Sequence, residues 1–172
     1  MEPRILYPSL STALFDQPGQ QPHSLPILPS SITLFLSINR YERKKNLALA
    51  IRSFARLPKT DLTGCHLVLA GGYDPRVQEN LDYFTELEEL AKSLNLRPDR
   101  VTLLRSPSDA EKVWLLQRAD CLLYTPAGEH FGIVPLEAMY CSTPVLAVDS
   151  GGPRETVVDG VTGWLREPTT EA

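Results

Sequence analysis

The sequence has no long apolar run and no recognisable targeting segment. No stretch approaches the roughly 20 consecutive apolar residues that span a bilayer, and the N-terminus lacks the charged and then apolar pattern of a secretory signal peptide. Acceptor sites of the form Asn-x-Ser/Thr are also absent. These absences predict a soluble, cytosolic chain with no membrane span.

Cysteine is scarce and positive charge is not in excess. Cys65, Cys121 and Cys141 are an odd set, and two of them lie in or beside apolar runs, which favours buried reduced thiols in a reducing compartment over disulfides. The net charge of -4 argues against general nucleic-acid binding, so any anion site must be local. A length of 172 residues with 42% hydrophobic content fits one globular domain with a core.

Several common nucleotide-site and metal-site motifs are missing. No G-x-G-x-x-G follows the first expected strand and no G-x-x-x-x-G-K-[ST] occurs, so a nicotinamide site or a P-loop would lack its phosphate cradle. No Asp-x-Asp pair occurs either, which disfavours a divalent metal held by carboxylates. We therefore expect neither a cofactor nor a metal.

The hydrophobic pattern predicts alternating strands and helices after an irregular start. Residues 1–30 contain six prolines and little periodic apolar signal, which indicates a linker or arm, and residues 31–172 form the expected domain. Buried strands are expected at 32–38, 66–70, 101–104, 121–125, 144–148 and 162–165, separated by helices at 47–57, 77–94, 109–119, from Pro135 onward and at 154–158. This order predicts an α/β fold with a doubly wound parallel sheet, Rossmann-like.

In such sheets ligands bind beyond the carboxyl ends of the strands. Five loops follow the expected strands there: 40–45, 71–73, 105–108, 125–132 and 150–153. We expect all five to line one crevice.

The loop after the fourth strand carries two acids, Glu129 and Glu137. A single helix through both would hold them about 12 Å apart. Proline is favoured at the first helical position, so Pro135 predicts a helix that starts there, with Val134 as its cap and Glu137 as its third residue. Both carboxylates would then face one space where free amides also favour an anion.

Each of these residues has a functional and a plain interpretation. Glu129 suits an orienting contact with sugar hydroxyls, or it is an exposed loop acid. Glu137 suits a ribose diol, or it only complements the helix dipole. The amides of Phe131, Gly132 and Ile133 suit an anion, or Gly132 is simply a turn residue. His130 is expected to pack or face solvent rather than catalyse.

The loop after the first strand supplies cations. Arg40 and Lys45 would neutralise a diphosphate and stabilise its growing charge as it leaves. The alternative is a solvent-exposed basic loop, and Lys44 competes for the role assigned to Lys45. The pairs Gly71-Gly72 and Gly151-Gly152 suit the close approach of a ligand or simple turns.

Together these residues resemble the C-terminal, donor-binding domain of the retaining glycosyltransferases of family 4, which have the two-domain GT-B fold. The resemblance covers residues 32–168. It rests on Glu-x7-Glu at Glu129 and Glu137, Arg-x4-Lys at Arg40 and Lys45, and the Gly-Gly-x-x-Glu turn that ends at Glu155, in the family's order.

Longer stretches at 37–46, 70–74 and 124–140 are similar to the dolichol-pathway mannosyltransferases of that family, which extend the lipid-linked N-glycan precursor on the cytosolic face of the endoplasmic reticulum. The resemblance implies GDP-mannose as donor and a lipid-linked oligosaccharide as acceptor. It implies that Arg40 and Lys45 bind the diphosphate, Glu129 the mannose and Glu137 the ribose. The amides of 131–133 and Gly71 would lie near the donor, and Arg105 and Ser106 near guanine.

The chain departs from the family in extent. Family members carry an N-terminal acceptor domain and closing helices that do not fit in 172 residues, so we expect a fragment that is inactive alone. Three rivals stay open: a family 4 enzyme that uses a UDP-sugar, a non-catalytic binding or scaffold protein, and a glycoside hydrolase. The last would need the carboxyl groups of Glu129 and Glu137 about 5–9.5 Å apart.

Overall fold

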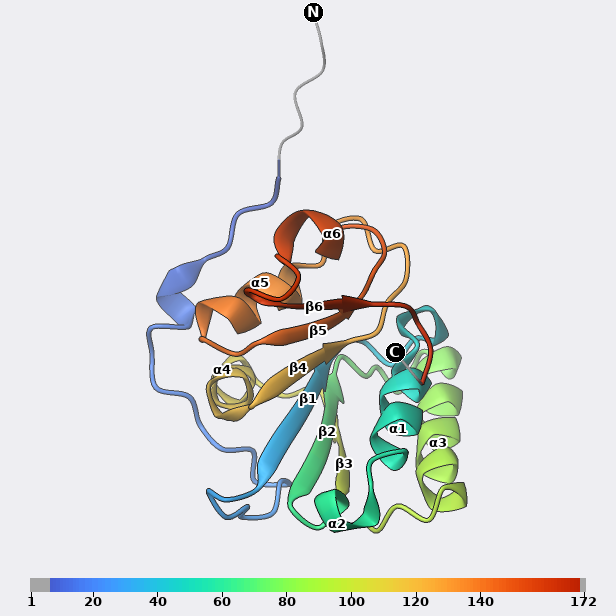
Figure 1. The fold of residues 1–172 in the computed structure, drawn as a ribbon. Helices are drawn as coiled ribbons and strands as arrows, with labels where there is room; N and C mark the ends of the chain where they lie inside the picture. Colours follow the sequence, from blue (N-terminus) through green and yellow to red (C-terminus); the bar gives the residue numbers. More distant parts are fainter. Residues whose placement is uncertain (1–6, 171–172) are drawn as a thin grey trace, which may run out of the picture.

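One sheet of six parallel strands runs through the middle of the protein (Figure 1). The computed structural model describes residues 7–170. The strand order is β3-β2-β1-β4-β5-β6. The strands are β1 Thr33–Ile38, β2 Cys65–Gly71, β3 Val101–Arg105, β4 Cys121–Tyr124, β5 Val145–Val148 and β6 Gly163–Arg166. The predicted doubly wound α/β fold is confirmed.

Helices cover both faces of this sheet (Figure 1). On one face lie α1 Leu47–Ala55 and α3 Gln78–Ser93, and on the other lie α4 Asp109–Arg118 and α5 Ile133–Tyr140. The short elements are α2 Lys59–Leu62, α6 Pro153–Thr156 and the 3-10 turns η1 Thr12–Leu14 and η2 Arg43–Lys45. The two turns and α2 were not predicted, because three or four residues carry too little periodicity to be recognised.

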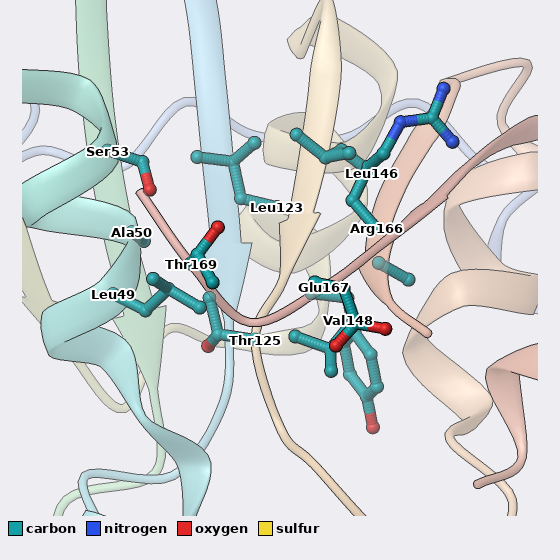
Figure 2. Close-up of a pocket in the computed structure, with 12 residues that line it drawn as sticks. Leu49, Ala50, Ser53, Leu123, Thr125, Leu146, Val148, Arg166, Glu167 and Thr169 are labelled. Carbon is teal, nitrogen blue, oxygen red and sulfur yellow. The ribbon is translucent and has the colours of Figure 1, made fainter. Parts of the chain in front are cut away.

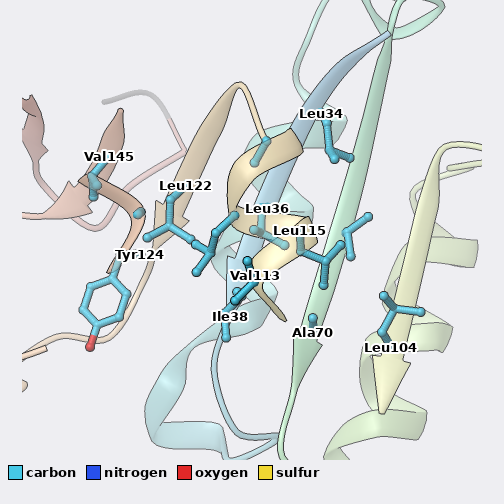
Figure 3. Close-up of a cluster of buried hydrophobic side chains, with 14 of the residues drawn as sticks. Leu34, Leu36, Ile38, Ala70, Leu104, Val113, Leu115, Leu122, Tyr124 and Val145 are labelled. Carbon is cyan, nitrogen blue, oxygen red and sulfur yellow. The ribbon is translucent and has the colours of Figure 1, made fainter. Parts of the chain in front are cut away.

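The side chains of each strand alternate between two cores. Leu34, Leu36 and Ile38 of β1 join the core under α4 and α5 (Figure 3), whereas Phe35 packs with the core under α1 and α3. In register, Leu36 pairs with Val68 on one side and with Leu122 on the other. Strand order reverses between β1 and β4, and this switch point is where open parallel sheets bind their ligands.

The proline-rich arm packs on the domain. Phe15 and Leu25 are buried in the core under α4 and α5, and the Gln117 side-chain amide donates to the carbonyl oxygens of Phe15 and Gln17 at 3.2 Å. Residues 1–6 of the predicted arm lie outside the described residues. That this arm links two domains stays a prediction.

The start of α5 was predicted wrongly. The helix begins at Ile133 rather than Pro135, with Gly132 as its cap, so Glu137 is the fifth helical residue and not the third. The amides of the first turn need no partner within the helix, so proline is tolerated at its third position as well as its first. Gly132 takes the left-handed conformation at φ 75°, which only glycine adopts easily.

Two further expectations concern cysteines and membranes. Cys65, Cys121 and Cys141 are all free, as predicted, but they are partly rather than fully buried. Burial raises the pKa of the Cys121 thiol to about 11. Within residues 7–170, no helix has the length and apolar character needed to cross a bilayer.

Candidate functional site

A cavity of about 300 Å³ opens at the carboxyl ends of β1 and β4, at the switch point of the sheet. Its walls include the last residue of each of these strands, Ile38 and Tyr124. Six of the predicted site residues line it: Arg40, Lys45, Gly71, Glu129, Gly132 and Ile133. Loops far apart in the sequence meet here because parallel strands end at one edge of the sheet.

Lys45 and Glu129 form an ion pair across this cavity. Lys45 is the last residue of η2, and Thr125, directly after β4, donates its hydroxyl to the Lys45 carbonyl oxygen at 2.7 Å. The two side chains are 13% and 25% exposed, so the pair is largely shielded from solvent. A low dielectric strengthens any charge interaction made at this point.

Arg40 is the more exposed cation of the cavity, with 67% of its side chain accessible. The Glu42 carboxylate lies 3.1 Å from the Arg40 guanidinium and 3.0 Å from the Lys44 ammonium. Glu42 therefore pairs with both cations. Lys45, not Lys44, lines the cavity, which favours the assignment made from the sequence.

The Glu129 loop is fixed by the Gly151-Gly152 turn. The Gly152 amide donates to the Glu129 carbonyl oxygen at 2.7 Å. A methyl group built on Gly151 would lie 2.2 Å from the same oxygen, and one built on Gly152 would lie 2.1 Å from the Phe131 carbonyl oxygen. These glycines allow the two loops to pack closely, a role that neither ligand approach nor a simple turn describes.

Gly71 is also required by the backbone. A methyl group at Gly71 would lie 1.8 Å from the Asn39 carbonyl oxygen, so no larger residue fits where β1 and β2 end. Gly71 borders the cavity through this close packing.

Glu137 is not one of the described residues that line this cavity. Its carboxylate is bound by Lys112 of α4, whose ammonium lies 2.7 Å from Oε1 and 2.6 Å from Oε2. Oε1 accepts a well-directed hydrogen bond, whereas Oε2 makes only the ion contact. The side chain of Lys112 is 23% exposed and that of Glu137 is 8% exposed. The Lys112 ammonium also lies 5.9 Å from the centre of the Phe15 ring.

Arg105, the last residue of β3, and Ser106, which follows it, lie outside this cavity. The Arg105 guanidinium stacks over the Tyr73 and Phe84 rings, 5.2 and 5.3 Å from their centres. The Ser106 amide donates to the Gly71 carbonyl oxygen at 2.7 Å, which ties this loop to the cavity wall. Phe131 also lies outside the lining and packs its ring against Tyr7, with centroids 5.7 Å apart.

A second, smaller cavity of about 80 Å³ lies on the other side of β4 and β5, against α1 (Figure 2). Its walls are mostly aliphatic, with Leu49, Leu123 and Leu146 among them, and Thr169 near the end of the chain lies across it. None of the predicted site residues borders this cavity. Among the described residues of its lining, Arg166 is the one cation, and its guanidinium already pairs with Asp159 at 2.9 Å.

Three residues of the site do not stand out in the sequence: Glu42, Lys112 and Tyr124. Lys112 could have been noticed, because Ser108 and Glu111 form a capping box that places it in the first turn of α4. Nothing in the sequence pairs it with an acid 25 positions later.

The glycosyl transferases group 1 family model matches residues 28–172, which is most of the chain and includes every residue of the cavity. The chain belongs to this family. The resemblance inferred from Glu129, Glu137, Arg40 and Lys45 is thereby confirmed at the level of the family.

Curated relatives narrow the comparison. The chain is 49% identical over 170 residues to the alpha-1,3/1,6-mannosyltransferase ALG2 of Mus musculus, and 48% identical over 172 residues to that of Homo sapiens. These alignments cover 96% and 98% of this chain but 41% of either relative. The chain is thus a homologue of a mannosyltransferase and spans less than half of the relatives' length.

Solved structures share the fold. The sucrose-phosphate synthase of Thermosynechococcus elongatus superposes with a TM-score of 0.76 at 30% identity, over 84% of this chain and 35% of that one. Anabaena HepE in complex with UDP and glucose gives a TM-score of 0.72 at 29% identity, over 82% of this chain and 36% of that one.

Proposed function

We propose that this chain is the GDP-mannose-binding half of a retaining α-1,3/α-1,6-mannosyltransferase. The observation that carries the proposal is the convergence of Arg40, Lys45 and Glu129 on one cavity at the switch point of the sheet. The 49% identity to a relative named as such an enzyme supplies the choice of sugar and linkage.

In this proposal the protein stabilises the leaving group and needs no metal. Arg40, Lys45 and the amides at the start of α5 surround the donor diphosphate and counter its growing negative charge. Glu129, paired with Lys45, would turn toward the mannose hydroxyls once phosphate oxygens take over the ammonium. Glu137 would accept from the ribose diol, and the Arg105 and Ser106 loop would flank guanine.

The acceptor would be a lipid-linked oligosaccharide on the cytosolic face of the endoplasmic reticulum. Positioning two substrates supplies a large part of the rate of a transfer reaction. We therefore expect the 172-residue chain alone to bind donor weakly and to transfer no mannose. Transfer to a lipid-linked oligosaccharide by this chain alone would contradict this part of the proposal.

Calorimetric titration of GDP-mannose tests the donor site. Arg40→Ala should weaken binding about tenfold, because a charge-assisted contact to phosphate is lost. Arg97→Ala is the matched control, since this exposed arginine pairs with Asp99 between α3 and β3, at the opposite edge of the sheet. Equal affinities of Arg40→Ala and the wild type would reject the site.

A UDP-sugar enzyme is the second candidate, because HepE, a relative in fold and at 29% identity, was crystallised with UDP and glucose. A ligand that binds only the folded state stabilises it by RT ln(1 + [L]/Kd), so at equal concentration the tighter ligand raises the melting temperature more. Comparing GDP and UDP at equal concentration separates the two candidates. A larger shift with UDP would replace GDP-mannose by a UDP-sugar.

A further inference from the structure

Tyr124, the last residue of β4, is 3% exposed, yet its hydroxyl has no hydrogen-bond partner among residues 7–170. Its ring stands at the end of the strand, beyond the buried aliphatic side chains (Figure 3). The hydroxyl oxygen is not one of the fully buried polar atoms without a partner, so it reaches the solvent of the cavity although its ring is buried. A hydroxyl in this position is free to bond a ligand.

The hydroxyls of the other buried tyrosines bond to the protein itself. The Tyr41 hydroxyl lies 3.0 Å from the Leu69 carbonyl oxygen and 2.9 Å from that of Leu104. The Tyr83 hydroxyl accepts from the Ala48 amide at 3.2 Å. The missing partner is therefore specific to Tyr124.

The hydroxyl of Tyr124 is directed into the donor cavity. Tyr124 and Gly132 both line this cavity, and a methyl group built on Gly132 would lie 3.0 Å from the hydroxyl oxygen. Gly132 is the cap of α5 and provides no side-chain cap, so the amides of Ile133 and Val134 have no partner within the helix. The hydroxyl thus lies beside the residue that directly precedes these two amides.

The surroundings also decide what the hydroxyl does. Burial, followed by the negative charges of Glu129 and Glu137, raises the pKa of Tyr124, so the phenol stays protonated and can donate. Arg40 and Lys45 line the same cavity. A group that accepts hydrogen bonds and carries negative charge suits this set of donors and cations.

We propose that Tyr124 is a donor-binding residue whose hydroxyl donates a hydrogen bond to a diphosphate oxygen of the sugar nucleotide, beside the amides of Ile133 and Val134. This inference rests on the proposed function and names a contact in its site. The sugar of the donor molecule could accept the same hydrogen bond. The test distinguishes a bond to the diphosphate from a bond to the sugar.

The test compares Tyr124→Phe with Tyr83→Phe in the 172-residue chain, by calorimetric titration with GDP and with GDP-mannose. Tyr124→Phe should weaken both ligands by the same factor, about tenfold, because the lost bond is to a charged group. Its melting temperature without ligand should equal or exceed that of the wild type, since no protein partner is lost. Tyr83→Phe should show the reverse: a lower melting temperature and unchanged affinities.

Three outcomes overturn the inference. Unchanged GDP affinity in Tyr124→Phe would mean that the hydroxyl meets only water. Weakening of GDP-mannose without weakening of GDP would assign it to the sugar. A wild type that binds neither GDP nor UDP would remove the inference together with the proposed function. If the wild type prefers UDP, the choice of GDP-mannose fails alone, and a tenfold loss of UDP affinity in Tyr124→Phe supports the inference.

Discussion

Removing Lys112 should destabilise the fold more than removing any exposed lysine, because it leaves the Glu137 carboxylate buried without its cation. The Lys112→Met change keeps an unbranched side chain of similar reach, so packing over Phe15 is largely preserved. The lost contribution is then mainly the ion pair, whose ammonium lies within 2.7 Å of both carboxylate oxygens.

The exposure of the two side chains sets the magnitude. Breaking a fully buried pair costs about 3–5 kcal/mol. Glu137 is 8% exposed, but Lys112 is 23% exposed, so solvent already screens part of the interaction. We expect Lys112→Met to lower the free energy of unfolding by about 2–3 kcal/mol, which for a chain of this size lowers the melting temperature by roughly 4–12 °C.

Urea unfolding followed by circular dichroism measures this change, and Lys92→Met is the matched control. Lys92 is exposed near the end of α3, so its replacement should change stability by less than about 0.5 kcal/mol. The double variant Lys112→Met/Glu137→Gln should be more stable than the sum of the single changes, because a neutral amide no longer needs the cation. A Lys112→Met chain within 0.5 kcal/mol of the wild type would refute the reasoning.

The same variant also bears on the proposed role of Glu137. If Glu137 accepts from the ribose diol, the wild type should prefer GDP to 2′-deoxy-GDP. In Lys112→Met this preference should shrink, since the carboxylate loses the ammonium that orients it. A wild type without such a preference would remove Glu137 from the donor site and leave the stability argument intact.

Three further predictions address the cations, the strand ends and pH. Glu42→Gln should tighten GDP binding roughly two- to threefold at low salt and have no effect at high salt, because the carboxylate that neutralises Arg40 and Lys44 is removed. A titration that shows weaker GDP binding would contradict this. Gly71→Ala should cost several kcal/mol through the clash with Asn39, whereas Gly64→Ala, with no atom nearer than 3.6 Å to the added methyl, should cost less than about 1 kcal/mol in thermal melts. Burial lowers the pKa of His66 below its ordinary value, so the unfolded chain binds the proton more readily and stability should fall as pH drops below about 6.5; His66→Gln should flatten this slope in urea titrations at pH 5–7.5.

The convergence of Arg40, Lys45 and Glu129 could be predicted because it depends only on topology. Each follows a strand of a parallel sheet, and the carboxyl ends of such strands meet at one edge. The strands could also be predicted, because a strand that is buried on both faces has a short and nearly continuous apolar sequence. Family membership followed from the spacing of these residues.

Other parts of the site depend on contacts that no spacing encodes. The pairing of Lys112 with Glu137 joins α4 to α5 and needs the crossing of two helices to be known. The start of α5 lies two residues earlier than Pro135 suggested, after Gly132, whose positive φ and close contact with the Tyr124 side chain suit only glycine. In the sequence, Tyr124 marks only the end of a buried strand, and the position of its hydroxyl in the cavity follows from the folded structure alone.

The ion pairs at the site constrain how it would receive an anion. Lys45 is bound to Glu129, and Arg40 and Lys44 share Glu42, so the basic loop is partly neutralised by acids of the chain. A diphosphate that entered the cavity would have to displace Glu129 from Lys45, and the released carboxylate would be left in a shielded space that only hydrogen-bond donors could satisfy. Sugar hydroxyls are such donors, whereas free GDP offers none at that point. The exchange therefore favours a nucleotide that carries its sugar. In titrations, GDP-mannose should bind more tightly than GDP to the wild type but not to Glu129→Ala. An equal preference for GDP-mannose in both chains would rule the exchange out.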